Sequence, residues 1–191
     1  MSRVLFISES YVKDNTVLDE NVDAKLLRNV IEDVQRIKFE QYLGTDLYND
    51  FKTEIAADPD LSGNADYKTL LQEYIQPCLK HWVVFECCDY LVFKFRNKGV
   101  VKQNSENSQS LLLDEVQYLK DQSRIKAEFL AKRLVEYLCD NEDTYPKYND
   151  NGDSSDLQPT KNTYFSGIYL GLNEEPKDLQ SFYRDDTTEI L

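Results

Sequence analysis

Apolar residues recur at helical spacing through most of the first 140 residues, and the longest such stretch spans 66–98. Between Trp82 and Phe95 the apolar side chains point in nearly every direction around the helix axis, so this part must be covered on all sides. The stretch is too short between Glu86, Asp89 and Lys94 to cross a bilayer, which takes roughly 20 apolar residues. We therefore expect either the central helix of a bundle or a helix shared with a second subunit. Its apolar positions begin with Tyr67, Leu70, Leu71, Tyr74, Ile75, Cys78, Leu79 and Trp82.

The same periodicity predicts three further helices. The first covers about 21–42, follows Asp and Asn side chains that can cap it, and ends at Gly44. Thr45 is then placed to cap a second, shorter helix, and a last helix covers about 112–140. The apolar stripes of these helices are Val22, Leu26, Val30, Val34 and Ile37 in the first, Leu47, Tyr48, Phe51 and Ile55 in the second, and Val116, Leu119, Phe129, Leu130, Leu134 and Leu138 in the last.

Two places leave the shape of the central helix open. Pro77 lacks a backbone donor and disfavours the α conformation at Gln76, so the helix either kinks there or restarts with Pro77 at its first position. Residues 91–96 alternate apolar and polar side chains as a strand would, so the end of the helix is also open.

The ends of the chain differ from its middle. We predict an N-terminal arm over 1–20, a helical bundle over 21–140 and an acidic, extended C-terminal arm over 141–191. Within that arm, 141–159 has the Asp, Asn, Ser, Gly and Pro content of an exposed loop, and 164–170 reads as a short β-like segment. The expected fold class is all-α, a bundle of about four helices followed by this arm.

Charge excludes some functions. The 191 residues suffice for one domain with a core, and the formal net charge is −13. Residues 140–191 contain 12 Asp or Glu and 4 Lys or Arg. This balance argues against a protein that reads DNA sequence, which needs a basic footprint, although it suits a surface past which DNA slides. The N-terminus has no long apolar run, so we expect no signal peptide.

The candidate chemistry is sparse. His81, the only histidine, fits a structural role better than that of a catalytic base. Glu86 and Asp89 share one helix face and could bind a metal or act as an acid–base pair, but pairing with Lys or Arg of a neighbouring helix or subunit is the simpler interpretation. We find no nucleotide-binding or nucleophile motif, and we expect no catalytic residue, metal or cofactor. The cysteines fit reduced, buried thiols of a cytosolic setting: Cys78, Cys87, Cys88 and Cys139.

Aromatic residues without an evident place in a single-chain core indicate an assembly surface. The segment 164–170 lies beyond a polar linker and must fold back or lie on another chain, where it could add a strand. The candidate interface residues are Trp82, Phe85, Tyr90, Phe93, Tyr164, Phe165, Ile168, Tyr169, Leu170, Phe182 and Tyr183. A basic cluster either ends the central helix favourably or contacts DNA or an acidic partner, and it comprises Lys94, Arg96, Lys98 and Lys102.

Several runs resemble the head–tail connector (adaptor) proteins of tailed bacteriophages. ENVD at 20–23 and YLGTDLY at 42–48 resemble the opening of these proteins. FKFRNKGVV at 93–101, NSENS at 104–108 and RLVEYLCD at 133–140 resemble the crAss-like phage branch. The resemblance covers about 5–148 and leaves the acidic tail after Asp150 unmatched.

The resemblance implies a virion protein at the portal–tail junction, made in the host cytoplasm. It implies a cyclic, dodecameric ring of copies beneath the portal that extends the DNA channel and docks the tail or further ring proteins. It implies no catalytic site and no membrane contact, and packaged DNA would pass without being read. In a ring, every contact is heterologous. Two alternatives stay open: a soluble acidic helical binding protein that mimics DNA as an inhibitor, and a carboxylate–metal enzyme that uses Glu86 and Asp89.

Overall fold

The computed structural model describes residues 3–96, 99–102, 113–149, 156–159 and 161, and the side chains of 94–102 and 113 are outside this description. The fold is all-α, as predicted, and the described residues add one two-stranded hairpin. In chain order the elements are α1 (Glu9–Asn15), α2 (Ala24–Val34), the π-helix η1 (Gln35–Phe39), α3 (Glu40–Leu43), α4 (Thr45–Ala57), α5 (Ala65–Thr69), the π-helix η2 (Leu70–Ile75), α6 (Gln76–Val92), β1 (Phe93–Arg96), β2 (Gly99–Lys102), α7 (Leu113–Asp140) and α8 (Pro146–Asn149).

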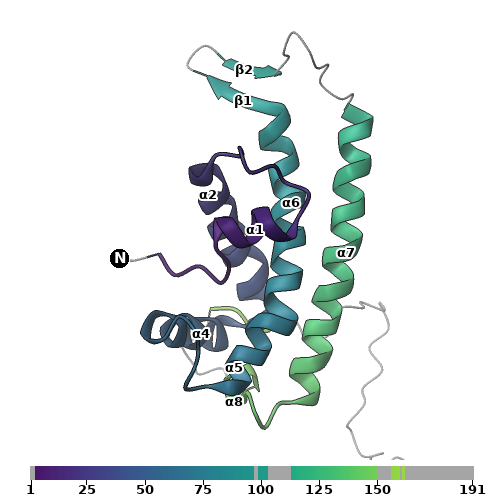
Figure 1. Ribbon diagram of the computed structural model, residues 1–191. Coiled ribbons are helices and arrows are strands. Elements are labelled where there is room, and N and C mark those ends of the chain that lie inside the picture. Colours follow the sequence, from purple (N-terminus) through teal and green to yellow (C-terminus); the bar gives the residue numbers. More distant parts are fainter. Residues whose placement is uncertain (1–2, 97–98, 103–112, 150–155, 160, 162–191) are drawn as a thin grey trace, which may run out of the picture.

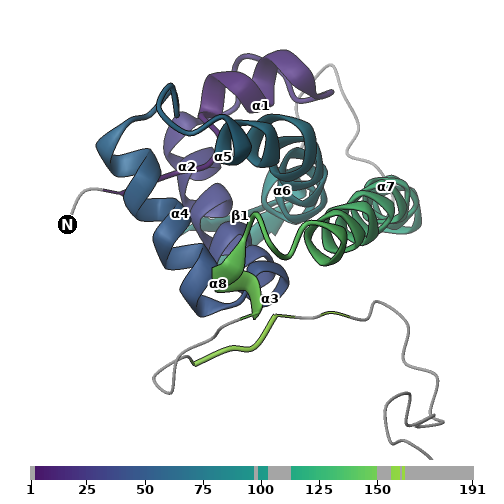
Figure 2. The same ribbon diagram turned by 90° about the horizontal axis from the view of Figure 1, so that it is seen from below.

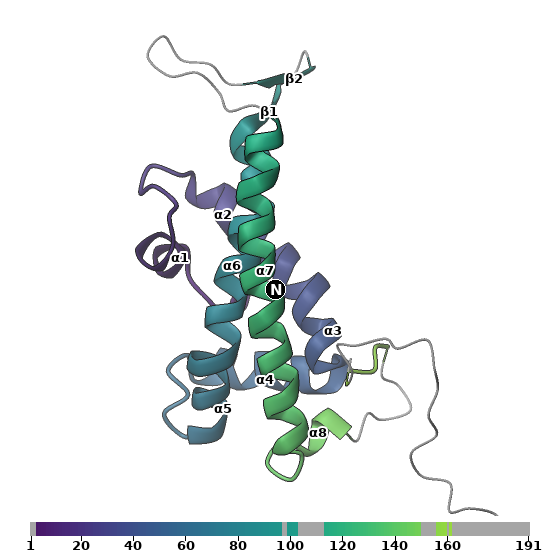
Figure 3. The same ribbon diagram turned by 90° about the vertical axis from the view of Figure 1, so that its right-hand side faces the viewer.

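Helix α6 forms the centre of the molecule, and α7 runs antiparallel beside it along most of its length (Figure 1). Helix α2 packs against a different side of α6, so that α6 lies between α2 and α7 (Figure 2). Helices α4, α5 and α8 gather at the lower end, whereas the hairpin projects beyond the upper end (Figures 1 and 3). Among the described residues, no helix has both the length and the apolar character of a membrane span.

The first long helical track runs from Ala24 to Leu43 through α2, η1 and α3, close to the predicted 21–42. Asp23 caps it by accepting a 2.8 Å hydrogen bond from the Lys25 amide. Gly44 ends it with φ 75°, a conformation that glycine adopts without strain. Thr45 does not cap α4 as expected, because its hydroxyl oxygen instead accepts a hydrogen bond from the amide of Leu157 at 2.9 Å.

The π-helix η1 changes which side chains of this track face the core. A π-turn adds residues to each turn and therefore rotates all later side chains relative to an α-helix. Phe39 is fully buried, whereas Ile37, which the helical stripe placed in the core, is 65% exposed. The prediction for Ile37 was therefore wrong, because it assumed an unbroken 3.6-residue period.

The second π-helix resolves the question raised by Pro77. Helix α6 continues the track of α5 and η2 without a break, and both Ile75 and Gln76 keep right-handed helical dihedral angles. The Gln76 amide bonds to the Leu71 carbonyl in the wider π pattern. Pro77 therefore lies inside a continuous helical track, directly after a π-helix whose wider turn accommodates the missing donor.

The ends of the bundle are more ordered than the sequence indicated. Phe6, Ile7 and Val12 of the predicted N-terminal arm belong to the core. The buried Gln35 side chain fixes this segment, since its oxygen accepts from the Phe6 amide at 2.9 Å and its nitrogen donates to the Val4 carbonyl at 3.1 Å. The interpretation of 1–20 as an arm was therefore wrong over its described part.

The polar stretch 141–159 also returns to the core. Tyr145 and Tyr148 are fully buried, and the Tyr145 hydroxyl donates to the Asp66 carbonyl at 2.9 Å. Further along, Leu157 makes two hydrogen bonds with Thr45. Its carbonyl accepts from the Thr45 amide, and its amide donates to the Thr45 hydroxyl oxygen. The expectation of an exposed loop over 141–159 was therefore wrong at Tyr145, Tyr148 and Pro159, which are buried, whereas most of the other described residues of this stretch are exposed.

Candidate interaction surface

Most of α6 is covered by its own chain. Trp82 is only 4% exposed, and its ring meets that of Phe85 edge-on at 5.7 Å. The ammonium of Lys38, from η1, lies 4.6 Å from the Trp82 ring centroid, a cation–π distance. Trp82 is therefore unavailable to a second subunit, and its proposed place in an interface was wrong. The all-round apolar helix is explained by packing against α2 and α7 rather than by another copy.

The two carboxylates of α6 have separate surroundings. The Lys120 ammonium, from α7, lies 2.6 Å from an Asp89 oxygen and 4.7 Å from the ring centroid of the half-buried Phe85. Its side chain is only 14% exposed, so Lys120 joins the two helices through both charge and packing. Asp89 thus pairs with a neighbouring helix, as the simpler interpretation held, whereas Glu86 lines a groove described below. Among the described residues, no group of three His, Cys, Asp or Glu side chains is placed to hold a metal ion.

Burial shifts the pKa values of the histidine and of two cysteines of α6. His81 is half-buried, and this burial is the main cause that lowers its pKa. The nearby positive charges of Lys80 and Lys126 lower it further. Burial raises the pKa of the Cys78 thiol to about 12 and that of Cys87 to about 12. All four cysteines are free thiols. This part of α6 is therefore packed interior rather than a reactive site.

The stability of the protein is expected to fall in alkaline solution. The Cys78 and Cys87 thiols ionise near their ordinary pKa of 9 when unfolded, but only near about 12 when folded. Their contribution to the free energy of unfolding is thus complete below about pH 9 and is lost as the pH rises towards about 12. Urea unfolding at several pH values measures this decline, and Cys78→Ala with Cys87→Ala should make it shallower. An equal decline in the double variant would assign it to other groups.

Helix α7 carries apolar side chains on two opposite faces. The face on α6 is formed by small and branched residues: Val116, Ala127, Ala131, Leu134 and Leu138. Tyr118, Ile125 and Phe129 are 65%, 57% and 69% exposed and lie seven and four residues apart, so they form one row. At 3.6 residues per turn, this row lies roughly 180° from the buried face. We call Tyr118, Ile125 and Phe129 the α7 row. Helix α7 lies at one edge of the molecule (Figure 2), so a row opposite its buried face points away from α6.

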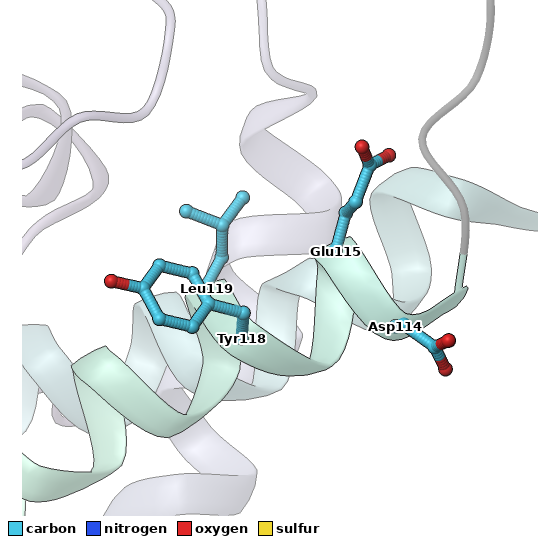
Figure 4. A pocket seen from close by; sticks show the side chains of 4 residues that line it. All are labelled: Asp114, Glu115, Tyr118 and Leu119. Carbon is cyan, nitrogen blue, oxygen red and sulfur yellow. The ribbon is translucent and has the colours of Figure 1, made fainter.

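The upper end of the α7 row borders an open hollow of about 430 Å³. Its lining consists of Asp114, Glu115, Tyr118 and Leu119, all from the first two turns of α7. Figure 4 shows the two carboxylates turned away from the Tyr118 ring, so the hollow has an apolar side and an acidic side. It extends the apolar surface of the row towards the hairpin.

A second apolar surface lies between α2, η1 and α6. It is a groove of about 140 Å³, lined by Val30, Asp33, Val34, Ile37, Lys38, Glu86 and Tyr90. Ile37 and Tyr90 are both exposed at its rim, so Tyr90 remains a candidate interface residue. Helices α2 and α7 pack on different sides of α6 (Figure 2). The groove, which α2 lines, and the α7 row, which lies opposite the buried face of α7, therefore belong to different sides of the molecule.

The remaining candidates lie at the hairpin or outside the described residues. The hairpin pairs Phe93 with Lys102 and Lys94 with Val101, so Lys94, Arg96 and Lys102 of the basic cluster lie on its two strands, directly after the end of α6. The Phe93 side chain is half-buried. Outside the described residues lie Lys98, Tyr164, Phe165, Ile168, Tyr169, Leu170, Phe182 and Tyr183.

A protein-family model covers most of the elements that form these surfaces. The model of DUF6712, a family of unknown function, matches residues 39–157. The chain belongs to the DUF6712 family. The DUF6712 region includes α6, the hairpin, the α7 row and the buried Tyr145 and Tyr148, whereas α1, α2 and most of η1 precede it. No significant match was found among curated proteins or among solved structures.

Sequence reasoning missed the α7 row of this DUF6712 chain. It assigned Leu119 and Phe129 to the buried stripe, but both are exposed. The buried face instead uses Ala127 and Ala131, whose small side chains let α7 approach α6 closely and give a weak apolar signal. The spacing of Tyr118, Ile125 and Phe129 was the available sign of a second face.

Proposed function

We propose that this chain is a structural virion protein whose copies form a ring beneath the portal, join the portal to the tail and extend the DNA channel. The proposal rests on the resemblance of the runs at 20–23, 42–48 and 93–101 to phage head–tail connectors. The observation that carries it structurally is the presence of two exposed apolar surfaces on different sides of one small domain.

Two unlike surfaces are what a ring requires. In a cyclic assembly of more than two copies, each copy presents one surface to its neighbour on one side and a different surface to the other. The α7 row of one copy would face the groove rim of the next, at Ile37 and Tyr90. Monomeric proteins keep contiguous exposed apolar patches small, so covering both surfaces would stabilise the assembly.

The proposed role is mechanical. The charge of −13 would let DNA pass along the channel without adhering, and the portal, the tail or further ring proteins would be the partners. No enzymatic step is part of this role. A ring whose lumen is basic would contradict the sliding surface.

Introducing a carboxylate into either surface is expected to weaken association of the full chain at least about tenfold, or about 1.4 kcal/mol. The variants are Phe129→Glu on the α7 row and Ile37→Glu on the groove rim. If the contact is head-to-tail, each variant still has one unaltered surface. An equimolar mixture of the two variants should then form one-to-one dimers that do not assemble further. Sedimentation velocity, with electron microscopy of the wild-type particles, measures these states.

The matched control is Val17→Glu, which places the same charge at an exposed apolar residue outside both surfaces and should leave association unchanged. A wild-type chain that sediments as a monomer at all concentrations and fails to bind a purified portal ring would contradict the proposal. If that monomer instead competes with DNA for an enzyme, the function is inhibition by charge mimicry.

A further inference from the structure

Some charged side chains beside the α7 row have an ion-pair partner and others have none. Between residues 121 and 136, α7 has four basic and three acidic side chains. Arg124 pairs with Asp121 and Glu128, and Lys132 pairs with Glu136. Arg124 therefore serves two carboxylates and Lys132 one, whereas Lys126 and Arg133 have no carboxylate partner within ion-pair distance among the described residues.

These two cations lie on the same flank of the α7 row. Lys126 and Arg133 are seven residues apart, which returns to the same side of an α-helix after two turns. Arg133 lies over the Tyr74 ring at 5.0 Å, while Lys126 is exposed. In a chain with a net charge of −13, the outer face of α7 is thus an apolar row beside unneutralised positive charge.

Residues 162–191 have the opposite composition. They contain six Asp or Glu against two Lys or Arg, together with five aromatic residues. Three of these aromatics fall in the stretch 164–170, which also contains Ile168 and Leu170. Aromatic and acidic side chains are the groups that an apolar row flanked by cations would bind.

The chain leaves the described structure close to the lower end of α7. Lys161 contacts Asn149, its ammonium lies 3.9 Å from a Glu142 oxygen, and it lies over the Tyr148 ring. From the end of α7, Phe129 and Ile125 are about 17 and 23 Å away at 1.5 Å per residue. An extended chain advances about 3.3 Å per residue, so 164–170 reaches about 10–30 Å from Lys161. The aromatic stretch can therefore reach these two residues.

We propose that residues 162–191 bind along the outer face of α7. The aromatic stretch 164–170 covers Phe129 and Ile125, and the acidic residues that follow it offset the charges of Lys126 and Arg133. In the proposed ring the segment would lie between the α7 row and the groove rim of the next copy, and it is able to come from either of these copies.

A photo-cross-linking residue, benzoylphenylalanine, placed at position 129 of the full chain tests the contact. Irradiation should join position 129 to the tryptic peptide 162–177, which mass spectrometry identifies. The same residue at position 17, which is also exposed and apolar but lies between α1 and α2, should not label that peptide. Cross-links from position 129 only to residues 3–161, or no cross-link at all, would overturn the proposal.

Charge reversal provides a second readout in folded protein. Lys126→Glu combined with Arg133→Glu should reduce the cross-link to 162–177 severalfold, and high salt should weaken it in the unmodified chain. Lys132→Glu is the matched control, because Lys132 is already paired with Glu136 and lies on the opposite flank of the α7 row. Equal effects of the two charge reversals would overturn the assigned flank.

Mixing ¹⁴N- and ¹⁵N-labelled chains shows which copy donates the segment. Mixed-isotope products assign the segment to a neighbouring copy, whereas single-isotope products alone assign it to the same copy. Either outcome places the segment on α7. Sedimentation of the Phe129→Glu and Ile37→Glu variants measures association separately. A cross-linked chain that stays monomeric therefore contradicts only the ring, and an assembled chain without the cross-link contradicts only this contact.

Discussion

Replacing Trp82 with alanine is expected to lower the free energy of unfolding by about 3–5 kcal/mol. The indole is 4% exposed, packs against Phe85 and lies under the Lys38 ammonium, so its removal leaves a cavity between α6 and η1. Urea unfolding followed by far-UV circular dichroism measures the change.

The matched control is Phe129→Ala, also an aromatic truncation on a long helix. Because Phe129 is 69% exposed, this change should alter the free energy of unfolding of the monomer by less than about 1 kcal/mol. Similar losses in the two variants would mean that the burial of Trp82 or the exposure of Phe129 is wrongly assigned.

Ending the chain after Thr144 is expected to lower the free energy of unfolding by at least about 5 kcal/mol, comparable to the whole stability of a small domain. The deletion removes Tyr145 and Tyr148, which are both fully buried. It also leaves the Asp66 carbonyl without the Tyr145 hydroxyl and exposes the Tyr67 ring, which stacks on Tyr145 at 5.9 Å. Thermal unfolding monitored by circular dichroism tests this.

A chain that ends at Lys161 is the control, because it keeps both tyrosines and should therefore lose far less stability than the chain that ends at Thr144. The single change Tyr148→Ala should itself cost about 3–5 kcal/mol, so the result does not depend on recovering the shorter chain. A folded chain ending at Thr144 with nearly full stability would show that residues 145–149 contribute little to the core.

Helical periodicity predicted where the chain is helical better than it predicted which sides of the helices are buried. The limits of the first and last helices and the stop at Gly44 follow from apolar spacing and capping residues, which act over a few neighbours. The exposure of Ile37 and Phe129 depends on the π-turn and on how closely α7 approaches α6, and neither is encoded within one turn of helix.

The candidate interface residues also show that predicting a helix is easier than predicting its exposed side. Tyr90 was named from its helix and is exposed at the groove rim, but Trp82 was named for the same reason and is interior. Tyr145 and Tyr148 were hidden within a polar stretch because composition averages over neighbours, whereas burial depends on single side chains. Only the partner helix decides which aromatic residues a long amphipathic segment leaves exposed.

The contact between Leu157 and Thr45 has a consequence for synthesis of the chain. Thr45 donates its amide to the Leu157 carbonyl at 3.0 Å and accepts from the Leu157 amide at 2.9 Å, which ties positions 112 residues apart. A ribosome therefore makes the corner at Gly44 long before it makes Leu157. The nascent domain waits with the places of Tyr145 and Tyr148 empty, and it closes only after residues 145–157 have left the ribosome.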